Sequence, residues 1–226
     1  MTSQLLFPSI FVDNRQEIFK ENKGKFLVIE GIDCSGKSTQ SGLLLKYLMK
    51  NNIPSVFFTF PDYTTNSGVK IKNYLQGKSN FDKNYFEMLQ HINKVEKQNI
   101  ILDYLKNGYY VICNRYIESQ YVYGQLEGYS LDCLMSINDS LPQSNIVFVL
   151  DLPIHIIKSR LEGRKRKYGK VDRYEENTEL LEKAREKYLE LAQKFDNWIV
   201  IDCYKKGMKQ INEEIISKLT LVLKVI

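Results

Sequence analysis

A glycine-rich loop between a predicted strand and a predicted helix constrains this chain more than any other feature. The residues from Gly31 to Ser38 read GIDCSGKS and fit the pattern G-x-x-x-x-G-K-[ST]. The run Phe26–Glu30 before the loop has the apolar, β-branched character of a buried strand, and leucines at helical spacing lie between Thr39 and Lys50. Loop N–H groups and the positive end of the new helix together attract an anion. The sequence therefore predicts a binding site for the phosphates of a nucleoside triphosphate.

The side chains of this loop have distinct expected roles. Lys37 is expected to contact the β- and γ-phosphates of ATP, and the Ser38 hydroxyl is expected to bind Mg²⁺. Further contacts with ATP are expected from the loop residues Gly31, Asp33, Cys34, Ser35, Gly36 and Thr39. The alternative, a chance glycine turn, does not explain all the fixed positions and both flanking elements at once.

Length and charge suit a single nucleotide-binding domain. The chain has 226 residues, which is enough for one sizeable α/β domain and short for two. Residues 1–24 precede the first predicted strand and are expected to form a loosely attached extension, so residues 25–226 form the predicted domain. A net charge of +5 suits polyanionic ligands. We expect no nucleic-acid partner, because no basic stripe interleaved with aromatic residues is present.

Neither a membrane span nor a signal peptide is predicted. No apolar run approaches the roughly 18 residues that a spanning helix needs, and the N-terminal segment lacks a basic region and a cleavage site. The four cysteines form no C-x-x-C pair and no histidine cluster accompanies them, which argues against a zinc site. This cysteine usage is typical of a reducing compartment and predicts a cytoplasmic protein.

Strands and helices alternate along the rest of the chain. Apolar runs predict further strands at Ser55–Phe60, Tyr109–Cys113, Ile146–Leu150 and Trp198–Ile201. Helical periodicity predicts helices at Gly68–Gln76, Phe86–Leu105, Ile154–Leu161, Glu179–Phe195 and Ile211–Leu223. This alternation predicts an α/β fold with a five-stranded parallel sheet that helices cover on both faces.

Three polar residues directly follow predicted strands. Ligands of parallel α/β folds bind beyond the carboxyl ends of the strands, which would gather Asp62, Arg115 and Asp151 around the phosphate-binding loop. The chain lacks the N-K-x-D motif with which GTPases read guanine. A small kinase, which holds a phosphate acceptor beside the γ-phosphate of ATP, is therefore the favoured class.

Several runs of residues resemble the thymidylate kinase family. The loop lies within VIEGIDCSGKSTQ at Val28–Gln40, and the aspartate inside it is a mark of that family. The match continues with Phe60–Pro61, with NRY at Asn114–Tyr116 and with DRYE at Asp172–Glu175. The resemblance implies a P-loop nucleoside monophosphate kinase fold with a lid over ATP, commonly as a homodimer. It also implies transfer of the γ-phosphate of ATP to dTMP, which gives dTDP, with Mg²⁺ as cofactor.

The resemblance also assigns roles around the acceptor nucleotide. Asp33 would reach the sugar hydroxyl, Arg115 would hold the acceptor phosphate, and Tyr123 would exclude a 2′-hydroxyl. Asp33, Lys37 and Arg115 would then be catalytic. The predicted acceptor site further includes Phe60, Tyr63, Gln90, Lys94, Ser119 and Tyr174.

A basic segment at about residues 160–174 is similar to the lid of this family. Some members carry an arginine in the loop where this chain has Cys34, whereas others place the catalytic arginine in the lid. The chain is similar to the second group, so Arg164 and Arg166 are expected to be catalytic and Arg160 is expected to bind ATP. The alternative is a solvated basic turn, as charge runs often are.

Four positions near the acceptor depart from the family pattern. Tyr63 stands where many members have an arginine, Gln90 replaces an aromatic residue that stacks on thymine, and Lys94 replaces an arginine that contacts the base. Asn114 replaces the aspartate of the usual DRY. Because a lysine does not reproduce the fork of an arginine, these changes leave the preferred base open.

Other functions are compatible with the sequence. A deoxynucleoside kinase would need a carboxylate base for its hydroxyl acceptor, and Asp62 or Glu118 could supply one. A kinase for another pyrimidine monophosphate is a second alternative. A non-catalytic nucleotide-binding protein is a third, but the intact Lys37, Ser38 and Arg115 argue against it.

Overall fold

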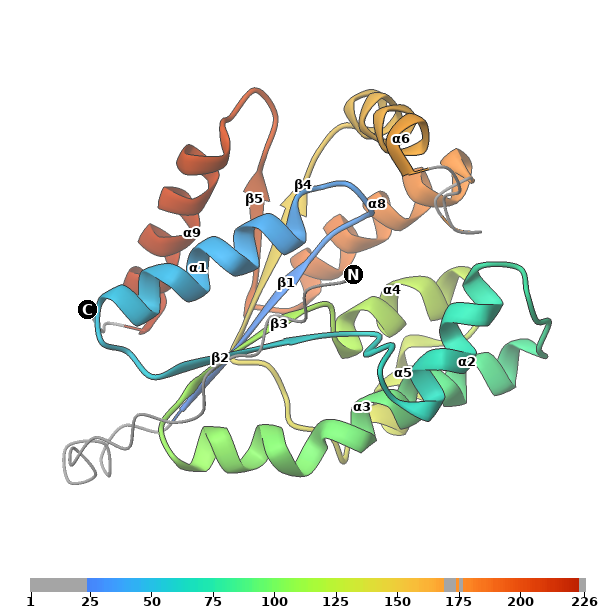
Figure 1. Ribbon diagram of the computed structural model, residues 1–226, viewed down its shortest axis with the longest axis horizontal. Coiled ribbons are helices and arrows are strands. Elements are labelled where there is room, and N and C mark those ends of the chain that lie inside the picture. The colour runs from blue at the N-terminus through green and yellow to red at the C-terminus, as the bar shows by residue number, and fades with distance from the viewer. Residues whose placement is uncertain (1–23, 169–173, 175–176, 224–226) are drawn as a thin grey trace, which may run out of the picture.

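A parallel sheet of five strands forms the centre of the computed structural model, which describes residues 24–168, 174 and 177–223 (Figure 1). The strands are β1 (Lys25–Glu30), β2 (Ser55–Thr59), β3 (Tyr110–Asn114), β4 (Ile146–Asp151) and β5 (Trp198–Asp202). They lie in the order β2-β3-β1-β4-β5, so the strand that leads into the phosphate-binding loop is central. The predicted α/β class and the five-stranded parallel sheet are confirmed.

Strand β1 occupies the centre because its side chains are apolar on both faces. Residues Phe26–Ile29 are fully buried. The strand pairs in parallel with β3, where Lys25 lies opposite Tyr110, and with β4, where Leu27 lies opposite Ile146. A continuous apolar run is what a parallel strand needs when helices cover both of its faces.

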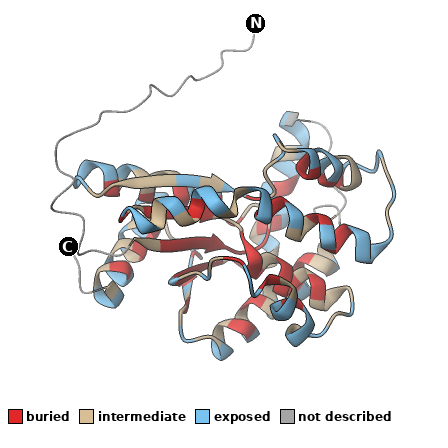
Figure 2. Ribbon diagram, turned by 90° about the horizontal axis from the view of Figure 1, so that it is seen from below, coloured by how far each residue is buried: buried red, intermediate tan, exposed pale blue. Residues whose placement is uncertain are grey.

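Helices cover the two faces of the sheet. They are α1 (Lys37–Lys50), α2 (Asn66–Leu75), α3 (Lys83–Lys106), α4 (Ile117–Leu126), α5 (Leu131–Asn138), α6 (Ile154–Tyr168), α8 (Thr178–Lys194) and α9 (Met208–Leu223). Helices α1 and α9 lie on one face, and α3, α4 and α8 lie on the other (Figure 1). Figure 2 shows that buried residues concentrate in the strands and in the helix faces turned toward them.

The helix predicted at Ile154–Leu161 extends further into the basic segment than expected. Helix α6 continues through Gly163 and ends at Tyr168. A Cβ atom at Gly163 would meet no neighbour within 4 Å, so nothing requires a glycine there and the residue does not mark a turn. Lysine and arginine are good helix formers, and cations at the last turn suit the helix dipole. Residues 169–173 of the expected lid, and residues 1–23 of the expected extension, lie outside the described residues.

Helices α4 and α5 are not predicted from apolar periodicity. In α4 the buried positions include Glu118, Gln120 and Gly124, so polarity does not separate its inner face from its outer face. Helix α5 has a usable signal in its cap, because the side chain of Ser130 accepts a hydrogen bond from the Cys133 backbone N–H at 3.2 Å. Serine before a short apolar run is a recognisable helix start.

The cysteines and the apolar content of the helices are the next two features. The cysteines Cys34, Cys113, Cys133 and Cys203 are all free thiols. Across the described ranges, no helix combines the length and the apolar character that crossing a membrane requires.

Candidate active site

A cavity of about 590 Å³ opens beyond the carboxyl ends of β1, β2 and β3. Parts of the phosphate-binding loop, α3, α4 and α6 line it together. The predicted site residues that line it are Asp33, Cys34, Gly36, Lys37, Ser38, Thr39, Phe60, Tyr63, Gln90, Lys94, Arg115, Ser119, Tyr123, Arg160, Arg164 and Tyr174. Gly31 and Ser35 belong to the loop without lining the cavity, and Arg166 is an exposed residue of α6 outside its lining.

The phosphate-binding loop has the backbone that its glycines permit. Gly31 has a φ of 132°, and a Cβ atom there would lie 2.6 Å from the carbonyl oxygen of Leu150, so only glycine fits. Lys37 opens α1, and its ammonium group donates to the carbonyl of Ile32 at 2.7 Å. Burial, together with the neighbouring charge of Arg115, lowers the pKa of Lys37 to about 8. The loop therefore places a buried amine at the floor of the cavity.

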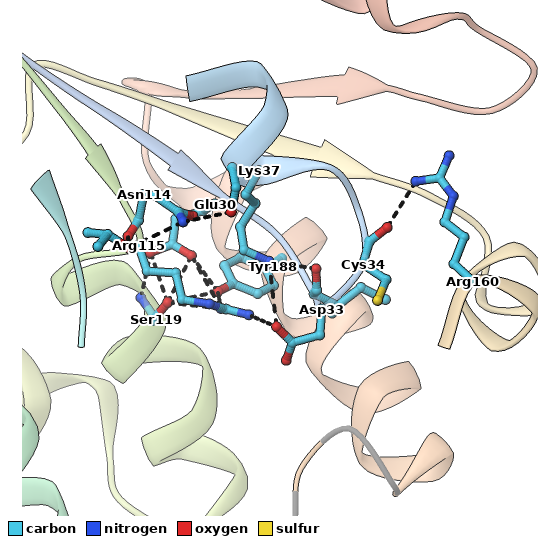
Figure 3. Close-up of polar contacts among 12 residues, drawn as sticks. Glu30, Asp33, Cys34, Lys37, Asn114, Arg115, Ser119, Arg160 and Tyr188 are labelled. Carbon is cyan, nitrogen blue, oxygen red and sulfur yellow. Dashed lines mark hydrogen bonds and ion pairs between the residues drawn. The ribbon is translucent and has the colours of Figure 1, made fainter. Parts of the chain in front are cut away.

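Arg115 and Asp33, which both line the cavity, form an ion pair (Figure 3). The Arg115 Nη2 atom donates to the Asp33 Oδ1 atom at 2.7 Å. Burial alone would raise the pKa of Asp33, but Arg115 and Lys37 lower it to about 2. Burial would lower the pKa of Arg115, yet Asp33 holds it well above its ordinary value. Both groups therefore stay ionised, and Asp33 can only accept hydrogen bonds.

Glu30 is a buried carboxylate that the sequence analysis does not single out. It is fully buried at the end of β1. Its oxygens accept hydrogen bonds from the Tyr116 backbone N–H, from the backbone N–H and hydroxyl of Ser119, and from the Tyr188 hydroxyl. Arg115 lies 3.8 Å from the same carboxylate. An acidic residue inside an otherwise apolar buried strand is the signal that could have revealed it.

Asn114 links the loop to the end of β3. Its side-chain amide donates to the Ser38 hydroxyl at 3.1 Å and to the Thr59 hydroxyl at 3.3 Å. The Asn114 Oδ1 atom is buried and has no hydrogen-bond partner among the described residues. An acceptor without a donor is unusual for a buried amide, so the site suits a further donor beside Ser38.

Two tyrosines that line the cavity stack on each other. The rings of Tyr123 and Tyr174 lie 5.6 Å apart between centroids and are nearly parallel, at 12°. The Arg115 guanidinium lies 5.8 Å from the centroid of the Tyr123 ring. The Tyr123 ring therefore has an aromatic neighbour and a cationic neighbour that fix its position in the cavity.

A chain of buried polar side chains joins α3 to α4. The Lys94 ammonium donates to the Gln90 carbonyl and to the Gln120 side-chain oxygen, both at 2.8 Å. The Gln120 amide nitrogen donates to a Glu87 carboxylate oxygen at 3.0 Å. Burial lowers the pKa of Lys94 to about 8. Glu87 and Gln120 were not predicted, although Glu87 lies three residues before Gln90 on the same helix face.

The basic helix α6 reaches the loop through two arginines. Arg160 donates to the Cys34 carbonyl at 2.9 Å, and the Arg164 guanidinium lies 3.6 Å from the Cys34 sulfur. The charge run is therefore more than a solvated turn, because part of it packs against the phosphate-binding loop.

Two carboxylates that were expected beside the phosphate-binding loop, Asp62 and Asp151, form ion pairs outside the cavity lining. Asp62 forms an ion pair with Lys97 at 2.9 Å and accepts from Thr64, and it does not line the cavity. Asp151 binds Arg185 through both carboxylate oxygens and is also absent from the lining. The expectation that Asp62 and Asp151 join Arg115 in the cavity lining is wrong, because each carboxylate pairs with a cation, Lys97 or Arg185, that also lies outside the lining.

Glu118 is likewise not a site residue. Its side chain is 2% exposed, lies outside the cavity lining and accepts from the Ser144 hydroxyl at 2.6 Å. Its other carboxylate oxygen has no partner among the described residues. Burial raises the pKa of Glu118 from 4.5 to about 7. The contribution of Glu118 to the free energy of unfolding is therefore fully present below pH 4.5, and it is lost as the pH rises through 7.

Glu118→Gln is expected to stabilise the protein at pH 8 relative to wild type, by about 2 kcal/mol more than at pH 5. The amide stays neutral where the buried carboxylate must ionise. Chemical denaturation at the two pH values measures the difference, with the exposed Glu186→Gln as a control that should show no such dependence. An equal effect of Glu118→Gln at both pH values would contradict the account.

Comparisons with known proteins agree on one family. The family model for thymidylate kinase matches residues 29–215. The chain is 33% identical over 204 residues to a thymidylate kinase of Plasmodium falciparum, across 89% of this chain and 92% of the relative. It is 34% identical over 194 residues to a probable thymidylate kinase of Methanocaldococcus jannaschii, across 86% of this chain and 95% of the relative.

A solved structure supports the same comparison. The thymidylate kinase of Candida albicans superposes with a TM-score of 0.75 at 26% identity, over 89% of this chain and 93% of that one. That structure is described as revealing the origin of broad substrate specificity. The similarity therefore extends over most of the chain in both sequence and fold.

Proposed function

The chain belongs to the thymidylate kinase family and transfers the γ-phosphate of ATP to dTMP, and on this premise we propose specific roles for the residues of its cavity. Lys37 contacts the transferring phosphate from the loop. Arg115 holds the phosphate of dTMP, and Asp33 accepts a hydrogen bond from the sugar hydroxyl. The loop backbone cradles the phosphates of ATP, as a helix N-terminus preceded by glycines does.

The ion pair between Asp33 and Arg115 carries the assignment of a monophosphate acceptor. A nucleoside acceptor needs a carboxylate base, but Arg115 and Lys37 lower the pKa of Asp33 to about 2, too low for an effective base near neutral pH. Glu87, the other carboxylate that the described residues contribute to the lining, is engaged by Gln120. A monophosphate is already an anion and needs cations. Among the described residues, the charged groups that line the cavity are the carboxylates Asp33 and Glu87 and the cations Lys37, Lys94, Arg115, Arg160 and Arg164.

The residues beside Ser38 fit a magnesium ion. The Ser38 hydroxyl would be its protein ligand, and the orphaned Asn114 Oδ1 atom would accept a hydrogen bond from a water bound to the metal. A magnesium ion held there would supply positive charge against the charge that develops on the phosphates during transfer. Asn114 can perform this role as an acceptor, even though it lacks the charge of an aspartate.

The described residues of the basic segment, 160–168 and 174, are proposed to belong to the lid, with Arg164 as its catalytic arginine. Arg164 lines the cavity and reaches Cys34, whereas Arg166 is exposed and does not line it. We expect Arg164→Ala to lower kcat by about 100-fold with a smaller rise in KM for ATP, because the contact forms chiefly in the transition state.

Arg166→Ala serves as the matched comparison for Arg164→Ala, since it removes the same charge from the same helix. Steady-state kinetics should show a clearly smaller loss of kcat for Arg166→Ala. A larger loss for Arg166→Ala would assign the catalytic role to that residue instead, and an effect of Arg164→Ala confined to KM would indicate ordinary ground-state binding.

Tyr123 is proposed to exclude ribonucleotides. Its ring is held by Tyr174 and Arg115, so it cannot swing away at little cost to admit a 2′-hydroxyl. We expect kcat/KM to be higher for dUMP than for UMP. Tyr123→Ala should lower the ratio of these two kcat/KM values by about tenfold. Tyr204→Ala, at a tyrosine outside the cavity, should leave the ratio unchanged. Equal kcat/KM for UMP and dUMP in the unmodified chain would refute the role.

Base selection is proposed to be modest. Gln90 offers no aromatic face at the cavity, and Lys94 is held by Gln90 and Gln120, so a methyl group on the base gains little contact. One methyl group contributes only about 1–3 kcal/mol even in a well-shaped pocket. The ratio of kcat/KM for dTMP over dUMP measures this selection, and a ratio above about 200 would contradict the proposal.

A homodimer is proposed to form through α3. The side chains of Met88, Ile92 and Val95 are 44%, 40% and 42% exposed, and their spacing places them along one face of the helix. An exposed apolar stripe of this kind suits association with a second copy. Sedimentation equilibrium should give twice the mass of one chain, and a monomer at micromolar concentration would contradict the dimer.

A further inference from the structure

We propose that Tyr188, a residue of α8 outside the cavity, positions Arg115 for phosphoryl transfer through a network centred on Glu30. This inference rests on the proposed role of Arg115. Tyr188 does not line the cavity, so it cannot touch either nucleotide and is a positioning residue rather than a catalytic one.

The hydroxyl of Tyr188 is the point where α8 meets the site (Figure 3). It donates to the Glu30 Oε2 atom at 2.7 Å and lies 3.2 Å from the Ser119 hydroxyl. It also accepts from the Arg115 Nη1 atom at 3.4 Å. The side chain is 1% exposed, and burial followed by the Glu30 charge raises the pKa of Tyr188 well above its ordinary value. The hydroxyl therefore keeps its proton and remains a donor to Glu30.

The network fixes one side of the Arg115 guanidinium and leaves the other side to Asp33. Ser119 accepts from the Nη1 atom at 3.2 Å, and Asp33 accepts from the Nη2 atom at 2.7 Å. Glu30 holds Ser119 and Tyr188 in place and adds its charge 3.8 Å from the Nη1 atom. A guanidinium anchored on two sides loses little freedom when it meets a phosphate, which is the condition for efficient transfer.

Helix α8 is a rigid support for this anchor. Arg185, three residues before Tyr188, binds Asp151 at the end of β4 with distances of 2.6 and 2.9 Å. The Tyr188 ring also packs near Trp198 of β5, with centroids 6.4 Å apart. The same helix therefore connects the sheet to Arg115.

Tyr188→Phe removes only the hydroxyl and keeps the ring that packs in the core. We expect kcat for dTMP to fall about tenfold while KM for ATP stays within about twofold, because a buried hydrogen bond to an ionised group is lost. Tyr121→Phe is the matched control, since Tyr121 is also buried but stacks on Phe195 away from Glu30. Thermal unfolding of both variants checks that the fold persists.

A double-mutant cycle separates positioning from a general effect on the fold. In an Arg115→Lys background, Tyr188→Phe should lower kcat by less than about twofold, because the guanidinium that it positions is absent. An unchanged kcat in Tyr188→Phe alone, or the same tenfold loss in both backgrounds, would overturn the positioning role. A normal kcat/KM for dTMP in Arg115→Lys alone would overturn the proposed role of Arg115 as well, so the two failures are distinguishable.

Discussion

Lys37→Met is expected to lower kcat/KM by about a thousandfold while leaving the fold intact. Lys37 lines the cavity at the end of the phosphate-binding loop, where we propose that it contacts the transferring phosphate, so its loss removes charge stabilisation of that group. A thousandfold corresponds to about 4 kcal/mol of transition-state stabilisation. Methionine keeps the unbranched chain of lysine, so the packing of the loop should persist.

Lys46→Met is the control for this variant. Lys46 is an exposed residue of the same helix and lies outside the cavity lining. Steady-state kinetics should show normal values for the control, and thermal unfolding should show that both variants are folded. If Lys37→Met keeps a near-normal kcat, the loop does not hold the transferring phosphate and the proposed site is wrong.

Arg115→Lys is expected to lower kcat/KM for dTMP by about 100-fold, with a smaller effect on KM for ATP. Lysine keeps the positive charge but lacks the planar fork that contacts Asp33, Ser119 and Tyr188 together. The acceptor phosphate would then meet a cation whose direction is no longer fixed.

Lys97→Arg provides a comparison at a cation that lies outside the cavity lining. Lys97 pairs with Asp62, and replacing its ammonium group with a guanidinium group should leave kcat/KM for dTMP and KM for ATP close to wild type. If Arg115→Lys raises KM for ATP and leaves KM for dTMP unchanged, Arg115 binds the donor nucleotide instead.

The sheet could be predicted from the sequence because each strand is a short apolar run bounded by turn or polar residues. The phosphate-binding loop needs no tertiary information either, since Gly31, Lys37 and Ser38 are fixed by one short motif. Asp33 followed from the family resemblance, and Arg115 followed both from it and from its position after a strand; the structure places the Arg115 Nη2 atom 2.7 Å from the Asp33 Oδ1 atom. The residues of the site that belong to short sequence motifs could therefore be predicted from the sequence.

The rest depends on contacts between distant positions. Tyr188 meets Glu30 across 158 residues, and Lys94 meets Gln120 across 26, which no local pattern encodes. Asp62 was misplaced for the same reason, because its partner Lys97 lies on another element. The charge of Asp62 and its position after a strand predicted a place in the site, but Asp62 instead forms an ion pair with Lys97 outside the cavity lining.

The acceptor assay tests the central claim most directly. The purified chain is incubated with ATP, Mg²⁺ and either dTMP or thymidine, and all nucleotides are separated and quantified. We predict that dTMP gives dTDP and ADP in equal amounts and that thymidine is not phosphorylated. Formation of dTMP from thymidine, with no dTDP from dTMP, would contradict a cavity built to hold an anionic acceptor.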